Sequence, residues 1–334
     1  MKSVGVSDQS GVAEARRAAT HLAERVGFTE TDAGKLALIA TELSTNLVKH
    51  GSGGEILVGT YEDNESHGIE ILALDKGAGM SNVAACLEDG YSSAGTAGHG
   101  LGSVIRQSHF VDIGSWPGVG TAVLARVAPG KTSPEKISPN APPAVPTWGG
   151  VSIAKAGEEV CGDAWSVSNT GDVRTLLVAD GLGHGPEAAE AAVEAVRLFH
   201  RYGGHTVTNL IDYIHGGLRS TRGAAVSIAR FDPAIRKIVF SGIGNIAGVL
   251  VAAGETKRMV SMAGTAGFNA RKIQSFDYAF ERGLAILHSD GLASSWTIDR
   301  YPNLTALHPS LIAAILYRDF TRHRDDATVL VAKW

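Results

Sequence analysis

Aspartates recur where strand-like segments begin or end in the second half of the chain. Asp180 directly follows the apolar run VRTLLVA, and Asp290 follows the run GLAILHS. Asp163 lies beside another such segment, and Asp325 and Asp326 precede the final run, ATVLVAK. A single Asp-Gly pair is most simply a turn. The recurrence of aspartates at strand edges instead predicts that these carboxylates converge.

Converging carboxylates repel one another, so they need a cation to remain charged together. Because all of these donors are oxygen atoms, Mg²⁺ or Mn²⁺ is favoured over zinc. Two such ions about 3.5–4 Å apart can activate a water and neutralise a phosphoryl group during in-line attack. This chemistry requires neither a cysteine nor a serine nucleophile, and it leaves the choice between the two metals open.

A row of polar side chains stands out in the first half of the chain. Glu42, Asn46 and His50 follow one another at intervals of four residues. Each advances about 40° around a helix of 3.6 residues per turn, so the three share one stripe. The stripe lies beside the apolar one, where polar groups are partly buried and need partners. A solvated helix flank explains this row about as well as a binding site does.

Two glycine-rich segments follow this row. In LALDKGAGM, Asp75 ends an apolar strand and is followed by Gly77 and Gly79. A carboxylate there can accept a hydrogen bond from an exocyclic amine, while the glycines let the backbone approach a flat ring. The stretch GTAGHGLGSV places four further glycines before a helical segment: Gly95, Gly98, Gly100 and Gly102. Backbone amides in such a loop can cradle phosphates, although a surface loop alone would explain either segment.

The elements that must position these residues follow from the hydrophobic periodicity. The segments VAEARRAATHLAERVGF and TDAGKLALIATELSTNLVKH are predicted helices, and the second has one apolar stripe, made of Leu36, Ile39, Leu43 and Leu47. Gly51 predicts the end of this helix. Three predicted strands come after the helices, with the sequences EILVGTYE, GIEILALD and TAVLARVA. Helices followed by strands predict an α+β sandwich.

A proline-rich segment divides the chain. Six of the eleven prolines lie within residues 127–150. Because proline cannot donate a backbone hydrogen bond, this density predicts an extended linker rather than a sheet. The length of 334 residues also favours two domains. We therefore divide the chain into a domain of residues 1–128, a linker of residues 129–147 and a domain of residues 148–334.

The bulk composition narrows the class of protein. Hydrophobic residues make up 44% and charged residues 19% of the chain, as in globular proteins, and a net charge of −4 without a basic stripe argues against nucleic acid. The two cysteines, Cys86 and Cys161, form neither a metal-ligand spacing nor a disulfide framework. No signal peptide and no apolar stretch of the ~20 residues that cross a bilayer is evident. We expect a cytoplasmic protein without membrane contact.

The order of the motifs in the first half is a helix with Glu and Asn, then Asp-x-Gly-x-Gly, then Gly-x-Gly-x-Gly. This order resembles the GHKL (Bergerat) ATP-binding α/β sandwich over residues 10–127. The resemblance implies that Asn46 holds Mg²⁺ against the phosphates of ATP, that Asp75 reads adenine and that Thr121, in GVGTAVLA, supports Asp75 through a water. Glu42 matches the proposed general base. Five glycines match the ATP-binding loops: Gly77, Gly79, Gly98, Gly100 and Gly102.

The stretch ATELSTNLVKHG is similar to one branch of this family, the stressosome switch kinase and the anti-sigma-factor kinases. These proteins phosphorylate serine or threonine on small STAS-domain antagonist proteins, or they capture a sigma factor. A histidine kinase would need a dimerising helical hairpin with an acceptor histidine, and only one short helix precedes this domain. His50 matches a histidine common in the branch and receives no chemical role. The branch often pairs, so a homodimer stays open.

The second half carries GDAW, VADGLGHGPEAA, SGIGNIAGVLV, HSDGL and RDDATVLV in that order. These motifs resemble the PPM-type metal-dependent serine/threonine phosphatases over residues 147–334, in particular the short bacterial branch of the sporulation stage II phosphatase. The resemblance implies an α-β-β-α sandwich in which Asp180 bridges two metal ions, Mn²⁺ or Mg²⁺, and Gly181 offers its carbonyl. Three aspartates would complete the metal shell: Asp163, Asp290 and Asp325. Asp326 is the reserve for Asp325.

Together the two resemblances predict a fused partner-switching enzyme of bacterial signalling. The C-terminal domain would dephosphorylate serine or threonine on a STAS-domain anti-sigma antagonist or stressosome protein, and the N-terminal domain would phosphorylate a partner with ATP and Mg²⁺. One alternative makes the N-terminal domain a non-catalytic, ATP-dependent binding module that sequesters a sigma factor or regulates the phosphatase. Another is a general small-molecule phosphatase with a regulatory ATP domain.

Overall fold

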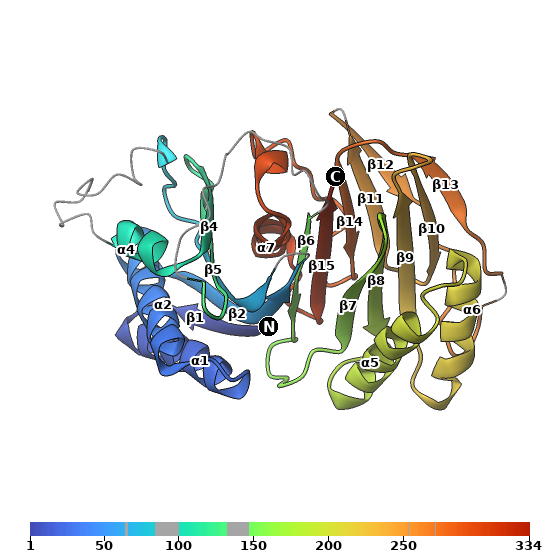
Figure 1. The fold of residues 1–334 in the computed structure, drawn as a ribbon, viewed down its shortest axis with the longest axis horizontal. Coiled ribbons are helices and arrows are strands. Elements are labelled where there is room, and N and C mark those ends of the chain that lie inside the picture. The colour runs from blue at the N-terminus through green and yellow to red at the C-terminus, as the bar shows by residue number, and fades with distance from the viewer. Residues whose placement is uncertain (64–65, 84–99, 132–146, 253, 271) are drawn as a thin grey trace. The chain divides into compact units, whose positions relative to one another are not determined.

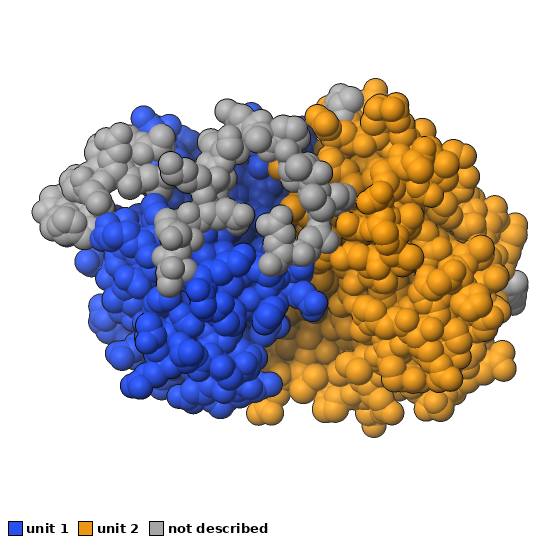
Figure 2. All heavy atoms as spheres, in the orientation of Figure 1, with its two compact units in different colours: residues 1–142, 298–318 blue, residues 143–297, 319–334 orange. Residues whose placement is uncertain are grey.

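The computed structural model describes residues 1–63, 66–83, 100–131, 147–252, 254–270 and 272–334. The chain divides into two compact units (Figure 2). Unit 1 comprises residues 1–142 and 298–318, and unit 2 comprises residues 143–297 and 319–334. The expected α+β class is confirmed in both units. Among the helices of the described residues, none combines the length and the apolar character needed to cross a membrane.

Unit 1 is built on one antiparallel sheet with the strand order β1-β2-β3-β5-β4 (Figure 1). Its strands are β1 (Lys2–Val6), β2 (Gly54–Glu62), β3 (His67–Leu74), β4 (Phe110–Trp116) and β5 (Gly120–Val127). The sequence patterns predicted β2, β3 and β5. The antiparallel register of β3 and β5 pairs Leu74 with Ala122, which brings the end of β3 and the start of β5 together.

Helices α1 (Gln9–Arg25) and α2 (Glu30–His50) cover one face of this sheet (Figure 1). Thr29 caps α2 by accepting a hydrogen bond from the Asp32 amide at 3.2 Å, and the helix ends at Gly51, as predicted. The predicted apolar stripe of α2 is buried against the sheet residues Ile56, Val58, Ile69 and Ile71. A third helix, α4 (Gly100–Gln107), packs beside α2.

The other face of the same sheet is buried as well. Successive strand residues point to opposite faces, so Leu57, Leu72 and Leu124 point away from α1 and α2, yet all three are fully buried. Residues 298–318 contact this second face and belong to unit 1. They contain η2 (Leu304–Ala306) and most of α7 (Pro309–Phe320).

Unit 2 contains two five-stranded antiparallel sheets, ordered β13-β10-β9-β8-β7 and β12-β11-β14-β15-β6. Their strands are β6 (Thr147–Ile153), β7 (Asp163–Thr170), β8 (Val173–Gly181), β9 (Ala224–Asp232), β10 (Lys237–Ile243), β11 (Ala247–Ala252), β12 (Glu255–Met259), β13 (Phe276–Ala279), β14 (Leu284–His288) and β15 (Ala327–Lys333). One apolar core lies between the sheets and includes Phe240 and Leu287. A second core lies under α5 (Pro186–Arg201), α6 (Val207–Gly217) and η1 (Leu218–Ser220).

Candidate nucleotide and metal sites

Helix α2 presents the predicted Glu42 and Asn46 to the start of α4. Both side chains are half-buried and lie one turn apart. A Cβ atom at Gly100, the first residue of α4, would lie 3.1 Å from Glu42 Oε2 and 3.5 Å from Asn46 Oδ1. The structure therefore brings the general-base candidate, the magnesium candidate and one predicted glycine together. Gly102 is buried in α4, and Gly98 lies outside the described residues.

Asp75, just beyond the end of β3, is held by two backbone amides. Its Oδ1 atom accepts hydrogen bonds from the Gly77 amide at 2.8 Å and from the Thr121 amide at 3.1 Å. Its other carboxylate oxygen, Oδ2, has no hydrogen-bond donor among the described residues. This arrangement fixes the orientation of the carboxylate and leaves one oxygen that can accept a hydrogen bond from an exocyclic amine.

The glycines after Asp75 are required by close backbone approaches. Gly79 has a φ angle of 69°, and a Cβ atom there would lie 2.1 Å from the carbonyl oxygen of Trp116. A Cβ atom at Gly77 would lie 2.8 Å from the carbonyl oxygen of His50. The turn that follows Asp75, the candidate for binding adenine, is thus packed directly on the end of α2. Side chains larger than hydrogen do not fit at Gly77 and Gly79.

Thr121 contacts Asp75 through its backbone, while its side chain turns to another partner. The Thr121 hydroxyl lies 2.8 Å from Ser115 Oγ, which also accepts a hydrogen bond from the Met80 amide at 2.7 Å. The predicted water between Thr121 and Asp75 stays a prediction. Sequence patterns had not singled out Ser115, and its position in β4, opposite Thr121, is its only signal.

Arg318 is a further neighbour of this turn that no motif indicated. Its guanidinium is almost fully buried and donates from Nη1 to the carbonyl oxygen of Asp75 at 2.7 Å. A longer contact of 3.3 Å joins the same nitrogen to the carbonyl oxygen of Thr121. Arg318 therefore holds together the two strand ends that carry the adenine-binding candidates.

Two of the predicted metal ligands face each other across a strand pair in unit 2. Asp163, at the start of β7, is paired with Asp180, near the end of β8. Burial, followed by the repulsion from Asp163, Asp290 and other nearby carboxylates, raises the pKa of Asp180 to about 9. Burial is also the main reason that the pKa of Asp163 is raised, to about 7. The structure thus brings aspartates from distant parts of the chain close enough to repel one another.

Two polar residues hold the predicted ligands by direct hydrogen bonds. Ser289 donates from Oγ to Asp163 Oδ2 at 2.6 Å, and Asn245 donates from Nδ2 to Asp290 Oδ2 at 2.6 Å. Both lie within segments that the sequence patterns highlighted, but neither had been given a role. Their donors aim the carboxylates, a task that residue type alone does not reveal.

The Asp325–Asp326 pair is divided between two environments. Asp326 is buried, and its two carboxylate oxygens accept hydrogen bonds from the backbone amides of Lys155 at 2.8 Å and Gly162 at 3.0 Å. Asp325 is exposed, and its Oδ1 accepts one bond, from the Asp326 amide at 3.0 Å. Both carboxylate oxygens of Asp326 are thus engaged by backbone amides, whereas one oxygen of Asp325 is engaged, which favours Asp325 as the ligand. That assignment stays a prediction.

Glycines shape this site as they do the other. A Cβ atom at Gly181 would lie 2.0 Å from the carbonyl oxygen of Ala188 in α5. A Cβ atom at Gly291, next to Asp290, would lie 2.0 Å from the carbonyl oxygen of Asp326. These approaches bring the end of β8 against α5 and the loop after β14 against the start of β15.

Comparisons with known proteins agree with this geometry. Residues 6–126 match the family model of the histidine kinase-like ATPase domain, and residues 171–334 match that of stage II sporulation protein E (SpoIIE). The chain joins a histidine kinase-like ATPase domain to a SpoIIE-type phosphatase domain. Both family resemblances predicted from the sequence are thereby confirmed.

Three relatives each cover between a third and three fifths of this chain. The serine/threonine-protein kinase RsbT of Bacillus subtilis (strain 168) is 28% identical over 122 residues, which are 36% of this chain and 92% of RsbT. A solved structure of the bacterial stressosome, described as a modular system adapted to control secondary messenger signaling, is 28% identical with a TM-score of 0.53 and covers 56% of this chain and 99% of its own. A structure of RsbX in complex with magnesium is 24% identical with a TM-score of 0.49, over 55% and 92% of the two chains.

The donor set of the phosphatase domain suits hard divalent cations, because its converging side chains are carboxylates whose repulsion a cation relieves. In the part of the chain that the structure describes, no three His, Cys, Asp or Glu side chains are already arranged around a single point that could hold an ion. The metal ligands Asp163, Asp180, Asp290 and Asp325 therefore remain predictions that rest on donor chemistry and on proximity.

Proposed function

We propose that the phosphatase domain removes phosphate from serine or threonine of a STAS-domain protein and that the ATPase domain phosphorylates serine or threonine of a partner protein. The observation that carries the proposal is that each domain gathers its own set of chemically suited residues. Glu42, Asn46 and Asp75 belong to the first set. The aspartates around Asp180 belong to the second.

In the ATPase domain, Asp75 Oδ2 would accept a hydrogen bond from the exocyclic amine of adenine, and the turn through Gly77 and Gly79 would lie against the adenine ring. Asn46 would hold Mg²⁺ beside the phosphates. Glu42 would take the proton of the attacking hydroxyl, a task for which a carboxylate beside the phosphates is suited. The N-terminus of α4 adds a favourable partial charge for the phosphates.

In the phosphatase domain, Asp163, Asp180, Asp290 and Asp325, with the carbonyl of Gly181, would hold two Mn²⁺ or Mg²⁺ ions. When bound, such ions neutralise a phosphoryl group and lower the pKa of water. The chain's own contribution is orientation. Ser289 and Asn245, described above, fix the directions of two carboxylates. The exposed loop at His184, whose Nδ1 lies 2.6 Å from Glu158 Oε1, would border the substrate.

Kinase and phosphatase activities on the same residue would waste ATP. We therefore expect two different target residues, or conditions that activate one domain at a time. A sigma factor captured by the ATPase domain is a further partner of the kind that the resemblance implies, and pairing of two chains through this domain is another.

The test is to incubate the full chain with STAS-domain proteins, phosphorylated and unphosphorylated, in the presence of ATP, Mg²⁺ and Mn²⁺, and to locate phosphate by mass spectrometry. Asp180→Ala should abolish dephosphorylation and keep nucleotide binding, whereas Asp172→Ala, on the exposed β7–β8 turn, should change neither. Glu42→Gln should abolish phosphate transfer and keep nucleotide binding, with Glu24→Gln on exposed α1 surface as the control.

The outcomes separate the alternatives. Normal turnover of a phosphoserine substrate by Asp180→Ala would contradict the metal assignment. Tight ATP binding without transfer to any STAS protein would leave the ATPase domain as a binding module. Equal turnover of small phosphate esters and phosphorylated STAS proteins would favour the general phosphatase.

A further inference from the structure

The segment of residues 298–318 belongs to one domain by sequence and to the other by contacts. It lies inside the part of the chain that matches the SpoIIE family, residues 171–334. Its contacts nevertheless place it in unit 1, on the sheet of the ATPase domain. This segment, the docking segment, includes Arg318, which bonds the strand ends that hold the adenine-binding candidates.

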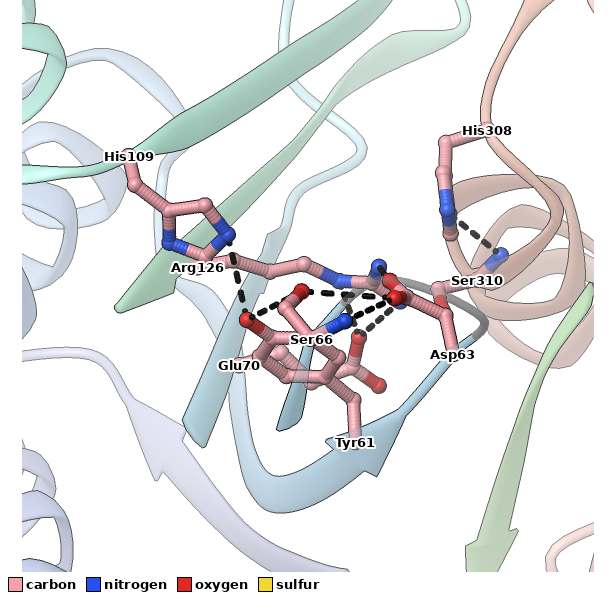
Figure 3. A network of polar contacts seen from close by, with 8 residues as sticks. All are labelled: Tyr61, Asp63, Ser66, Glu70, His109, Arg126, His308 and Ser310. Carbon is pink, nitrogen blue, oxygen red and sulfur yellow. Dashed lines mark hydrogen bonds and ion pairs between the residues drawn. The ribbon is translucent and has the colours of Figure 1, made fainter. Parts of the chain in front are cut away.

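A buried ionic network fastens the docking segment to the sheet (Figure 3). Arg126 Nε and Nη2 both donate to Glu70 Oε2 at 3.0 Å, and Nη2 also donates to Ser310 Oγ at 3.0 Å. Arg126 Nη1 donates to Asp63 Oδ2 at 3.0 Å, and its guanidinium lies 4.0 Å from the ring centroid of Tyr61. Ser310 thus joins an ion pair, Arg126 with Glu70, that is almost fully removed from water.

Further bonds follow the docking segment along its length. They run from Trp116 Nε1 to the Pro302 carbonyl (3.0 Å), from the His308 amide to Asp112 Oδ2 (2.6 Å) and from the Tyr317 hydroxyl to Glu55 Oε1 (3.1 Å). Residues Pro309 to Arg318 of α7 are all buried. Fixed contacts at both ends and in the middle indicate an ordered, specific attachment rather than a loose one.

The other end of α7 is bonded to a predicted metal ligand's loop. The Ala293 amide donates a hydrogen bond to the Phe320 carbonyl at 2.8 Å, and the Arg322 amide donates one to the Gly291 carbonyl at 2.8 Å. Leu292 and Thr321 pair between these two bonds. Gly291 directly follows Asp290, so α7 ends on the loop that positions this carboxylate.

We propose that Arg318 is a positioning residue of the nucleotide site and that α7 couples nucleotide binding to the loop of Asp290. The inference rests on the proposed ATP and phosphatase functions. A single residue, Asp319, separates Arg318, whose side chain bonds the Asp75 turn, from Phe320, whose carbonyl bonds the Asp290 loop. A nucleotide that orders the Asp75 turn strengthens the Arg318 bonds, which fixes the end of α7 and steadies the Asp290 loop.

Couplings between two sites commonly change affinity about 5- to 150-fold, and the lower end of that range sets the effect expected here. The assay measures hydrolysis of p-nitrophenyl phosphate by the full chain in the presence of Mn²⁺. We expect AMP-PNP with Mg²⁺ to raise the kcat/KM of this reaction at least about fivefold. Hydrogen exchange gives a readout that needs no turnover. AMP-PNP should slow exchange of the Ala293 and Arg322 amides, which donate the two bonds at the Asp290 loop.

The Arg318→Gln variant should lose both effects and bind a fluorescent nucleotide, mant-ADP, more weakly. Arg318→Lys keeps the charge and one donor toward the carbonyl of Asp75, so it should recover part of the nucleotide affinity and of the activation. Arg300→Gln is the matched control, because Arg300 is exposed on the same docking segment; it should behave as the wild type. Asp75→Asn, which removes the adenine contact, checks that AMP-PNP acts through the ATPase domain.

Failure of the inference is distinguishable from failure of the proposed function. Absence of mant-ADP binding or of phosphatase turnover in the wild type would remove the proposed function itself. If both are present, but AMP-PNP leaves the kcat/KM and the exchange of Ala293 and Arg322 unchanged, the coupling does not exist. Activation that persists in Arg318→Gln would show that α7 does not carry it, and inhibition by AMP-PNP would overturn the direction.

Discussion

The network around Arg126 allows one prediction to be developed from its contacts. Replacing Arg126 by leucine leaves a shorter, apolar side chain in β5 and removes the guanidinium. Glu70, which is 2% exposed, then loses both of its guanidinium donors, Arg126 Nε and Nη2. Ser310 loses the hydrogen bond from Arg126 at the same time. The change therefore leaves an uncompensated carboxylate inside unit 1.

The size of the stability loss depends on how deeply each lost interaction is buried. Removing one partner of a buried ion pair costs about 3–5 kcal/mol. The Asp63 contact adds little, since that side chain is 21% exposed and such pairs contribute about 0–1 kcal/mol. The cation–π contact with Tyr61 adds about 0.5–2 kcal/mol. We expect Arg126→Leu to lower the free energy of unfolding of unit 1 by roughly 3–5 kcal/mol, dominated by Glu70.

The loss should depend on pH. Burial raises the pKa of Glu70 above its ordinary value of 4.5, and Arg126 opposes that rise. Without Arg126 the pKa rises further, so the folded variant binds a proton more readily than the unfolded chain does. Stability of the variant is then retained at low pH and lost as pH rises through the raised pKa. The difference from the wild type should be smallest near pH 4.5 and largest well above the raised pKa.

Hydrogen exchange of the β3 and β5 amides measures the opening free energy of unit 1 without requiring the two units to unfold together. The double variant Arg126→Leu/Glu70→Leu is the control, since replacing both members of a buried pair by apolar residues is often nearly neutral. It should recover most of the loss and abolish its pH dependence. If Arg126→Leu stays within about 1 kcal/mol of the wild type at pH 8, or if the double variant is as unstable as the single one, the reasoning about Glu70 fails.

Two other predictions concern the candidate sites. Gly79→Ala should abolish mant-ADP binding, measured by fluorescence, because its Cβ would lie 2.1 Å from the Trp116 carbonyl and its φ is 69°; wild-type affinity would contradict the turn geometry. Asp325→Asn should weaken Mn²⁺ activation of the phosphatase without changing thermal stability. Asp326→Ala should lower the free energy of unfolding by about 1–3 kcal/mol, because the buried Gly162 amide and the partly buried Lys155 amide lose their acceptor. The opposite pattern in metal titrations and thermal melts would make Asp326 the ligand.

Much of the nucleotide site was predictable because its signals are local. The stripe of α2, its end at Gly51 and the turn after Asp75 lie in short stretches whose residue types leave few conformations. The contact of Gly100 with Glu42 and Asn46 also follows from two recognisable segments. The role of the Thr121 amide was not predictable, because a backbone donor has no residue type. Its function depends on strand register alone.

The aspartates of the phosphatase domain were predictable for a different reason. Carboxylates that recur at strand edges are rare without a cation, so their number carried the signal. Residue type alone could not rank Asp325 against Asp326, since both occupy the same motif, and only the family resemblance placed Asp325 first. The choice depends on which side chain meets the amides of Lys155 and Gly162, more than 160 residues away in the chain. Ser289 and Asn245 escaped notice because serine and asparagine serve many purposes at turns.

The docking segment shows what neither periodicity nor motifs can supply. Helix α7 reads as PSLIAAILYRDF, apolar on nearly all sides, which indicates burial but names no partner. On the sheet, Leu57, Leu72 and Leu124 alternate with the residues that face α1 and α2, a pattern that likewise demands a cover without identifying it. Only the folded chain shows that α7 covers this face of the sheet, with contacts made by Arg126, Ser310 and Arg318. A fragment of residues 1–142 would keep every nucleotide-site motif, but it would lack residues 298–318, which cover the second face of the sheet.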